Sequence, residues 1–261
     1  MTDPILEIRD AHVTFKRPGG QVLKAVNGVS LAMQPGEVVG LVGESGCGKS
    51  TLARAITGLQ PLESGQILFR GKEIRPLGLR RRKGEELSIQ MVFQNPYASL
   101  NPRRRISDQI EDGRAVSSTQ APTVKELLER VQLPAHYANR FPHEFSGGER
   151  QRIAIARAIA ASPQVLVGDE PIASLDASLQ IHVAELMRDL AKDTGASLLF
   201  ITHDLAIVRQ ICNRIIVMNA GKIVEQGPAE EIWDSPQETY TRKLLAAIPI
   251  ADGLGTIPVL D

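Results

Sequence analysis

The chain has 261 residues, 43% of them hydrophobic, which suffices for the core of one large α/β domain. Its 30 basic and 30 acidic residues balance, so no net field draws it to nucleic acid or anionic lipid. Cys47 and Cys212 lie far apart, which argues against a zinc site, an iron–sulfur cluster or a disulfide framework. The sequence shows no signal-peptide pattern and no apolar run near the roughly 20 residues of a membrane-spanning helix. We therefore expect a protein of the reducing cytoplasm that has no nucleic-acid partner.

The first predicted elements are an antiparallel hairpin and a strand–loop–helix unit. Leu6–Phe15 and Gln21–Met33 alternate apolar and polar residues around a Pro-Gly-Gly turn, which is typical of hairpin strands. Glu37–Val42 is a short apolar run that leads into a glycine-rich loop. This pattern predicts a buried parallel strand, followed by a helix from Lys49 to about Leu59.

Two later apolar runs, Val165–Gly168 and Ser197–Thr202, predict further buried strands, each preceded by a helical segment. In the segment 94–162 the strand signal vanishes, while residues 124–132 and 149–161 carry helical periodicity. We therefore predict a mostly parallel, helix-covered sheet with a helical insertion.

The predicted layout is one domain over residues 1–249. Its parts are a core with an antiparallel β subdomain (1–93 and 163–227), a helical subdomain (94–162), C-terminal helices (228–249) and a loosely ordered tail (250–261). The C-terminal segment should form two short helices broken at Ser235 and Pro236.

A phosphate-binding loop is predicted directly after the first buried strand. The segment GESGCGKS matches the pattern G-x-x-x-x-G-K-[ST], with the strand before it and the helix after it that the pattern requires. Glycines let backbone N–H groups converge on phosphate oxygens, Lys49 reaches the β- and γ-phosphates, and the Ser50 hydroxyl ligates Mg²⁺. A chance glycine-rich turn is the alternative. The residues expected to contact ATP here are Gly43, Glu44, Ser45, Gly46, Cys47, Gly48, Lys49, Ser50 and Thr51.

Hydrolytic residues are predicted at the carboxyl ends of two strands, where parallel sheets bind their ligands. Asp169 is placed to hold Mg²⁺, and Glu170 to act as general base toward the attacking water. An acid pair that caps a helix is the alternative. His203 follows the next strand and can hold the water and Glu170 in line, although an isolated histidine is more often an ordinary surface or core residue. Gln94 can supply a neutral oxygen to the metal or the water.

In the order of its motifs the chain resembles the ATP-binding cassette (ABC) family from Phe15 to about residue 249. Phe15 is similar to the aromatic residue that stacks on adenine, Gln94 to the Q-loop glutamine, and His203 to the switch histidine. FSGGE (145–149) resembles the signature motif and SLD (174–176) the D-loop. The resemblance implies a P-loop NTPase (RecA-like) fold with an antiparallel β subdomain and a helical insertion, that is, an ABC ATPase that uses ATP and Mg²⁺.

The signature has its own physical logic, because small residues before a helix form a second anion-binding site. In the family this second site faces the ATP of a partner cassette, so the resemblance implies a homo- or heterodimer. It adds the following residues to the nucleotide contacts: Ser146, Gly147, Gly148, Glu149 and Asp176.

Several positions depart from the commonest family pattern. Phe145 stands for leucine and Glu149 for glutamine in the signature, and Gly168 precedes the Walker B aspartate; Ile172 and Ala173 replace hydroxylated residues. None of these changes removes a group that handles phosphate, metal or water, so we expect an active site.

Within the family, YASLNPR (97–103), FPHEFSGGERQR (141–152) and TYTRKLLAAIP (239–249) resemble the peptide and nickel importers. That resemblance implies a second ATPase subunit, two transmembrane permease subunits and, indirectly, an extracytoplasmic solute-binding protein. The chain would then be cytoplasmic and peripheral on the inner face of the cell membrane. Residues 95–103 are the expected permease-docking surface, with Tyr97 as its apolar anchor.

Two other functions stay open on the sequence alone. One is an ABC ATPase that acts on ribosomes or DNA, although such relatives usually carry two cassettes or a long coiled-coil insertion. The other is a regulatory module that holds nucleotide without hydrolysing it, against which Glu170 and His203 argue.

Overall fold

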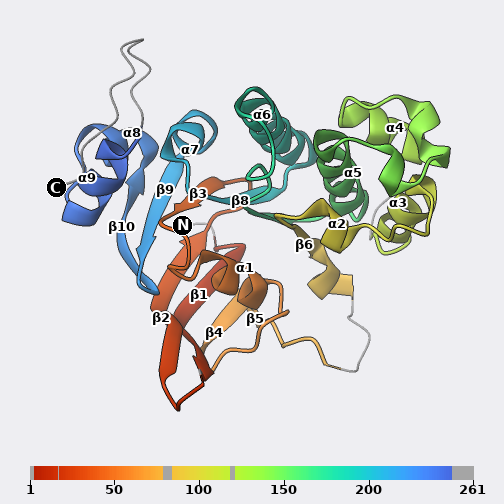
Figure 1. Cartoon of the computed structure of the whole chain (residues 1–261). Helices are drawn as coiled ribbons and strands as arrows, with labels where there is room; N and C mark the ends of the chain where they lie inside the picture. Colours follow the sequence, from red (N-terminus) through yellow and green to blue (C-terminus); the bar gives the residue numbers. More distant parts are fainter. Residues whose placement is uncertain (1–2, 17, 79–83, 118–120, 249–261) are drawn as a thin grey trace, which may run out of the picture.

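The computed structural model describes residues 3–16, 18–78, 84–117 and 121–248, arranged as two β-sheets with helices around them (Figure 1). The predicted tail, residues 250–261, lies outside these ranges. No helix in the described ranges has both the length and the apolar character needed to cross a bilayer.

The larger sheet has six strands in the order β10-β9-β3-β8-β7-β6. Neighbouring strands are parallel, except that β10 runs antiparallel to β9 at the edge. The strands are β3 (Val38–Val42), β6 (Ile89–Val92), β7 (Val165–Asp169), β8 (Ser197–Thr202), β9 (Arg214–Asn219) and β10 (Lys222–Pro228). The central strands are buried on both faces, which explains why they are continuous apolar runs rather than alternating ones.

The smaller sheet is antiparallel, in the order β2-β1-β4-β5. Its strands are β1 (Leu6–Lys16), β2 (Val22–Met33), β4 (Ser64–Phe69) and β5 (Lys72–Glu73). The predicted hairpin is therefore confirmed. The strands β4 and β5 were not predicted, because the first three residues of β4 are exposed and polar or glycine and β5 has only two residues.

Helices cover both faces of the larger sheet. The helix α1 (Lys49–Ile56) packs in the apolar cluster between the two sheets. The other face is covered by α6 (Ala177–Thr194) and α7 (Leu205–Ile211). The last two helices, α8 (Ala229–Asp234) and α9 (Thr239–Ala246), lie near β10 (Figure 1). The last two helices flank Ser235 and Pro236 as predicted.

In the described residues between β6 and β7, every regular element is helical. These are α2 (Pro96–Ser99), α3 (Ile106–Arg114), α4 (Val124–Arg130), α5 (Gly147–Ala160) and the 3-10 turns η2 (Ala135–Asn139) and η3 (Pro142–Glu144). A further 3-10 turn, η1 (Gly84–Ser88), precedes β6. The helical insertion is thus confirmed, while its exact limits, 94 and 162, stay a prediction.

The helix α1 corrects one predicted boundary, because it ends at Ile56 and not at Leu59. Gly58 adopts a left-handed conformation, with φ of 67°. Its N–H donates to Ala55 O at 2.9 Å and that of Leu59 to Arg54 O at 2.7 Å, which is the double bond of a Schellman motif. The glycine therefore ends the helix, and the apolar residue beyond it leaves the helical face.

The strands β9 and β10 were also missed, although β9 is part of the parallel core. The apolar run Ile215–Met218 is only four residues long and follows a helix without a glycine-rich turn. β10 is mostly partly exposed and lies at the sheet edge, where the burial pattern that marks central strands is absent.

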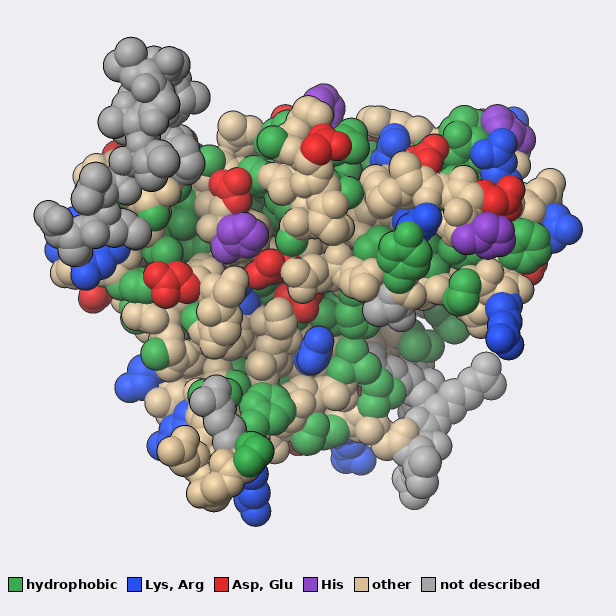
Figure 2. Space-filling model, viewed as in Figure 1, with side chains coloured by type: hydrophobic (Ala, Val, Ile, Leu, Met, Phe, Trp, Pro, Cys, Tyr) green, Lys and Arg blue, Asp and Glu red, His purple; other side chains and the backbone are tan. Residues whose placement is uncertain are grey.

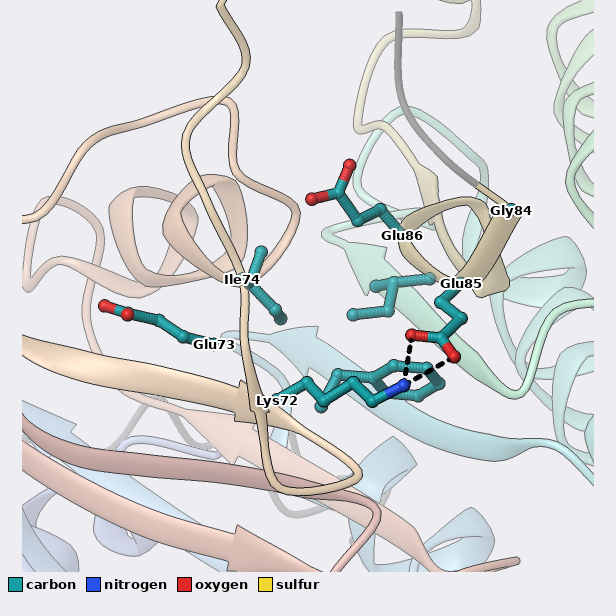
Figure 3. Close-up of a pocket in the computed structure, with 8 residues that line it drawn as sticks. Lys72, Glu73, Ile74, Gly84, Glu85 and Glu86 are labelled. Carbon is teal, nitrogen blue, oxygen red and sulfur yellow. Dashed lines mark hydrogen bonds and ion pairs between the residues drawn. The ribbon is translucent and has the colours of Figure 1, made fainter.

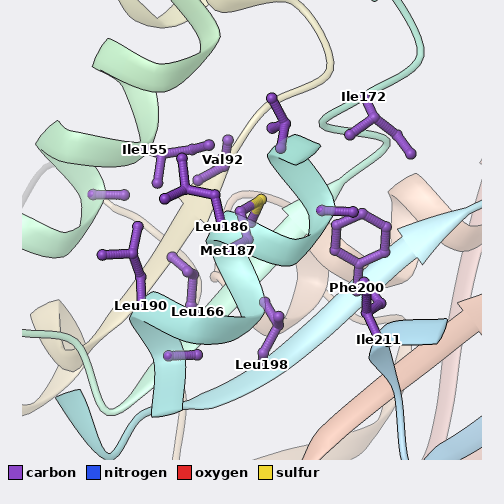
Figure 4. Packing of buried hydrophobic residues seen from close by; sticks show 14 of the residues in the cluster. Val92, Ile155, Leu166, Ile172, Leu186, Met187, Leu190, Leu198, Phe200 and Ile211 are labelled. Atoms are coloured by element: carbon purple, nitrogen blue, oxygen red, sulfur yellow. The ribbon is translucent and has the colours of Figure 1, made fainter. Parts of the chain in front are cut away.

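Phe200 is the bulkiest of the fully buried side chains and lies in the larger apolar cluster, on β8. Figure 4 shows its ring among side chains of the sheet and of the covering helices, near Ile172 and Ile211. Every face of the ring is therefore removed from water.

We predict that Phe200→Ala lowers the free energy of unfolding by about 3–5 kcal/mol, because the truncated side chain leaves a cavity that the close-packed core fills only partly. Denaturant unfolding of the purified chain measures this. The matched control is Val22→Ala, since Val22 is 57% exposed and should cost little. Equal losses for the two variants would contradict the assignment of Phe200 to the core.

Candidate nucleotide-binding site

The phosphate-binding loop (Gly43–Gly48) connects β3 to α1, and its glycines serve two purposes. A Cβ atom on Gly48 would lie 2.0 Å from Ala25 O, and one on Gly43 would lie 2.1 Å from Met218 O, so these positions must lack a side chain for the loop to pack. Gly46 has nothing within 4 Å of its Cβ position and a φ of 84°. It leaves the backbone accessible where a phosphate would approach.

Lys49 lies inside this loop with only 3% of its surface exposed. Its Nζ donates to Gly43 O at 2.6 Å and to Glu44 O at 2.9 Å, and it lies 3.7 Å from Glu170 Oε1. The ammonium therefore joins the loop to the acidic residue after β7.

Ser50 lies at the start of α1 and Asp169 at the end of β7, and the two side chains are in contact. The Ser50 hydroxyl donates a hydrogen bond to Asp169 Oδ1 at 2.7 Å. Burial raises the pKa of Asp169, and the hydrogen bond from Ser50 offsets only part of this effect. A hydroxyl and a desolvated carboxylate that face each other fit Mg²⁺, which takes few protein ligands and completes its shell with phosphate and water oxygens. No group of three or more acidic, histidine or cysteine side chains in the described ranges forms an all-protein metal cage.

Glu170 and His203 also lie together. Glu170 Oε2 is 3.5 Å from His203 Nδ1, and the Glu170 N–H donates to Ile201 O at 2.9 Å. The backbone of Glu170 has a φ of 46°, an unfavourable conformation for a residue other than glycine. Glu170 directly follows β7, and its carboxylate lies between Lys49 and His203.

One cleft of about 380 Å³ brings together nine of the nineteen predicted site residues. It is lined by Phe15, Leu23, Ala25, Ser45, Gly46, Gly48, Lys49, Ser50, Thr51, Gln94 and Glu170. The predicted adenine contact, the phosphate loop, the Q-loop glutamine and the acidic residue thus share one space. Leu23 and Ala25 were missed by the sequence analysis. The signal that finds them is the period-2 alternation of β2, which puts both on the strand face beside Phe15.

Gly43, Glu44 and Cys47 do not line the cleft. Cys47 is 7% exposed and packs in the apolar cluster between the sheets, and burial raises the pKa of its thiol. A thiol in this position reacts slowly, and a contact of Cys47 with nucleotide would have to come from its backbone.

The signature residues also lie outside this cleft. Ser146 caps α5: its Oγ accepts from the Glu149 N–H at 3.3 Å, while Glu149 Oε2 accepts from the Ser146 N–H at 2.8 Å. Tyr137 donates its hydroxyl to the other carboxylate oxygen of Glu149 at 3.1 Å. Glu149 is therefore engaged in holding the start of the helix, while the Cβ position of Gly147 is open.

Asp176 caps the neighbouring helix α6. Its Oδ1 accepts from the Leu179 N–H at 3.0 Å and from the Ser178 hydroxyl at 2.7 Å. These contacts lower the pKa of Asp176, so its carboxylate is charged at neutral pH.

A second pocket, of about 390 Å³, lies between the smaller sheet and η1. Figure 3 shows its labelled charged residues, with Lys72 paired to Glu85 at 2.7 Å. Phe69, Ile74 and Ile89 supply its apolar lining. Its described lining residues do not include a glycine-rich loop between a strand and a helix, so this lining does not match a phosphate-binding loop.

Charges of both signs are interspersed among the described residues of the face in Figure 2. This distribution agrees with the balanced composition.

A glycine-rich loop between a buried parallel strand and a helix, with a serine hydroxyl and two carboxylates beside it, defines a P-loop nucleotide-binding domain. A scan against known families matches residues 26–173 to the ABC transporter family. The chain belongs to this family and is an ABC ATPase.

Curated relatives cover almost the whole chain. The chain is 46% identical over 259 residues to the oligopeptide transport ATP-binding protein OppF of Bacillus subtilis (strain 168), covering 97% of this chain and 85% of the relative. It is 43% identical over 261 residues to the glutathione import ATP-binding protein GsiA of Escherichia coli (strain K12), where 96% of this chain matches 42% of the relative.

Solved structures confirm the predicted fold class. CbiO1 of Clostridium perfringens, part of the ABC transporter complex cbiONQ, aligns with a TM-score of 0.74 at 29% identity, covering 90% of this chain and 92% of that one. A dimeric ATP-binding cassette in a post-hydrolysis state, bound to ADP and Pi, aligns with a TM-score of 0.73 at 26% identity, covering 86% and 98%.

The capping network at α5 generates a prediction about stability and pH. Backbone and hydroxyl donors from Ser146, with the hydroxyl of Tyr137, lower the pKa of Glu149. We expect Glu149→Ala to lower the free energy of unfolding by about 1 kcal/mol at pH 7, because one half of the capping box is lost. A depressed pKa means that this contribution is complete above the unfolded-state pKa of about 4.3 and is lost as the pH falls through the lower folded-state value.

Denaturant unfolding of Glu149→Ala and the parent between pH 7 and pH 3 measures this difference. Glu149→Gln is the matched control, since a glutamine keeps the acceptor oxygen without the charge. A stability difference between Glu149→Ala and the parent that stayed constant over the whole range would contradict the role of the carboxylate.

Proposed function

We propose that this chain hydrolyses ATP at a site completed by a second cassette, and that the hydrolysis drives the uptake of peptides or related small solutes through a membrane permease. ATP hydrolysis is supported by one observation: Lys49, Ser50, Gln94 and Glu170 line the same cleft, and Asp169 is hydrogen-bonded to Ser50. The names of the relatives support the solute class.

Within the cleft, Phe15 stacks on adenine and the loop N–H groups hold the phosphates. The Lys49 ammonium moves from the carbonyls of Gly43 and Glu44 to the β- and γ-phosphates, exchanging neutral acceptors for charged ones. Burial of Lys49 strengthens that exchange.

Ser50 and Asp169, with Gln94, would hold Mg²⁺, which supplies positive charge to the phosphate oxygens when bound. Glu170 aligns a water and takes its proton as the oxygen attacks the γ-phosphorus and the bond to the β-phosphate oxygen breaks, giving ADP and phosphate. His203 holds the Glu170 carboxylate in line.

The second cassette is required because the signature residues lie outside this chain's own cleft. The start of α5, which Ser146 caps, offers the N–H groups of Gly147 and Gly148 and the positive end of a 14-residue helix dipole to an anion. The γ-phosphate in a facing cassette is the anion that such a helix start suits. Asp176 lies at the start of α6 and contacts the partner from there. The dimeric neighbour bound to ADP and Pi supports this pairing.

The membrane partners follow from the kind of importer. Two transmembrane permease subunits bind the two cassettes, and an extracytoplasmic protein delivers the solute. The chain is then cytoplasmic and peripheral on the inner face of the membrane. Peptides are the favoured solute and nickel is the other class that the subgroup resemblance implies.

The permease docks on the surface formed by residues 95–103. Tyr97 is 60% exposed there, which is unusual for a large aromatic side chain. The guanidinium of Arg150 makes a cation–π contact with its ring, with Cζ 4.1 Å from the ring centroid. Arg157 also donates to Ser99 O. Both arginines belong to α5, so the docking surface is attached to the signature helix.

We expect Glu170→Gln to keep ATP affinity but to lower the hydrolysis rate by at least about 100-fold, because the general base is lost. An ATP-bound dimer should accumulate, which size-exclusion chromatography with ATP measures. Lys49→Ala should instead weaken ATP binding by roughly tenfold or more, since a charged hydrogen-bond donor is removed. Hydrolysis by Glu170→Gln at the parent rate would exclude Glu170 as the base.

The transporter assignment predicts which proteins copurify. We would tag the chain in its native cell, solubilise membranes in mild detergent with ATP and vanadate, and identify the partners by mass spectrometry. Two polytopic membrane proteins and a second cassette are expected, and Tyr97→Ala should reduce their recovery while the exposed control Val22→Ala should not. Ribosomal or DNA-repair proteins without a membrane partner would contradict the importer function and leave the ATPase assignment intact.

A further inference from the structure

The C-terminal helix α9 contacts the phosphate-binding loop through one side chain. The backbone N–H of Glu44 donates a hydrogen bond to Tyr240 Oη at 3.0 Å, across 196 residues of sequence. Glu44 is the second residue of the loop, and its side chain does not line the nucleotide cleft. The bond therefore acts on the loop backbone from outside the cleft.

Tyr240 is well suited to accept this bond. It is half-buried, and its ring packs against the larger apolar cluster together with Trp233, Leu244 and Leu245. Burial raises the pKa of Tyr240, so the phenol stays neutral over the physiological range. The packing of the ring fixes where the hydroxyl oxygen lies.

The helix that carries Tyr240 is itself anchored at its start. Glu225, on β10, accepts from the N–H of Gln237 at 2.7 Å and from that of Glu238 at 3.2 Å. A carboxylate at this end of a helix satisfies otherwise unpaired donors and interacts favourably with the helix dipole. A continuous set of contacts thus runs from β10 through α9 to the loop.

The peptide groups of Glu44 are held from two sides. Its N–H is bound by Tyr240, while its carbonyl accepts from Lys49 Nζ at 2.9 Å. On the proposed function, Lys49 leaves this carbonyl when it binds the phosphates. The contact with Tyr240 does not involve Lys49, so a change of partner by Lys49 does not by itself remove it.

We propose that Tyr240 is a positioning residue for nucleotide binding, which holds the start of the phosphate-binding loop in its binding conformation while Lys49 changes partners. This inference rests on the proposed role of the loop and of Lys49. It gives α9 a function beyond covering the apolar core, and it predicts an effect on nucleotide affinity rather than on the chemical step.

The test is Tyr240→Phe, which keeps the ring and removes only the hydroxyl. ADP affinity is measured by titration of the purified full-length chain, and KM and kcat for ATP in the detergent-solubilised transporter. We expect the Kd for ADP and the KM for ATP to rise roughly three- to tenfold, the factor that one neutral hydrogen bond supplies, with kcat nearly unchanged. The Glu44 amide should also exchange its hydrogen faster in the variant.

Lys243→Ala is the matched control, because Lys243 is exposed on the same helix and should change none of these values. A melting temperature for each variant separates loss of folding from loss of affinity. Parent-like Kd and KM in Tyr240→Phe, or a fall in kcat alone, would overturn the positioning role while leaving the ATPase function standing. A parent chain that failed to bind ADP in the same titration would overturn both.

Discussion

The parallel register of β3, β8 and β7 is the constraint on which the rest of the site depends. β8 lies between the other two strands, with Val42 opposite Thr202 and Ile201 opposite Asp169. Because the carboxyl ends of all three strands lie at the same end of the sheet, the loop after β3, the carboxylates at the end of β7 and the histidine after β8 must meet there. Segments more than 150 residues apart in the sequence, such as Gly43 and His203, thereby reach one small volume.

Charged side chains are buried at the carboxyl ends of these strands, and a bound nucleotide would stabilise their charged forms. Asp169 is 4% exposed and has a raised pKa, while Lys49 is 3% exposed and donates to neutral carbonyls. Burial of a charged group carries a desolvation cost, and the raised pKa of Asp169 means that its present partners do not fully offset that cost. A phosphate chain would give Lys49 further anionic acceptors beside Glu170, and its counter-cation would present an opposite charge to Asp169.

The placement of the phosphate-binding loop and of the acidic residues beside it was predictable from the sequence because these residues come in short motifs. The loop glycines and Asp169 sit beside strands whose continuous apolar character marks them as buried. The contact of Tyr240 with Glu44 could not be predicted, because nothing in the local sequence of α9 indicates what lies 196 residues away. The small strands β4 and β5 were missed for a related reason, since they are defined by pairing with β1 rather than by their own pattern.

The departure at Gly168 from the common family pattern has a local packing cause. A Cβ atom at this position would lie 3.0 Å from Met187 Cε and 3.1 Å from Pro171 Cγ, so the glycine and its bulky neighbours fit one another. Because Met187 belongs to α6, whose first residues follow the Asp176 cap, this close approach seats the helix against the strand that carries Asp169. A substitution at Gly168 would therefore act on two segments at once, the strand that carries Asp169 and the helix that Asp176 caps.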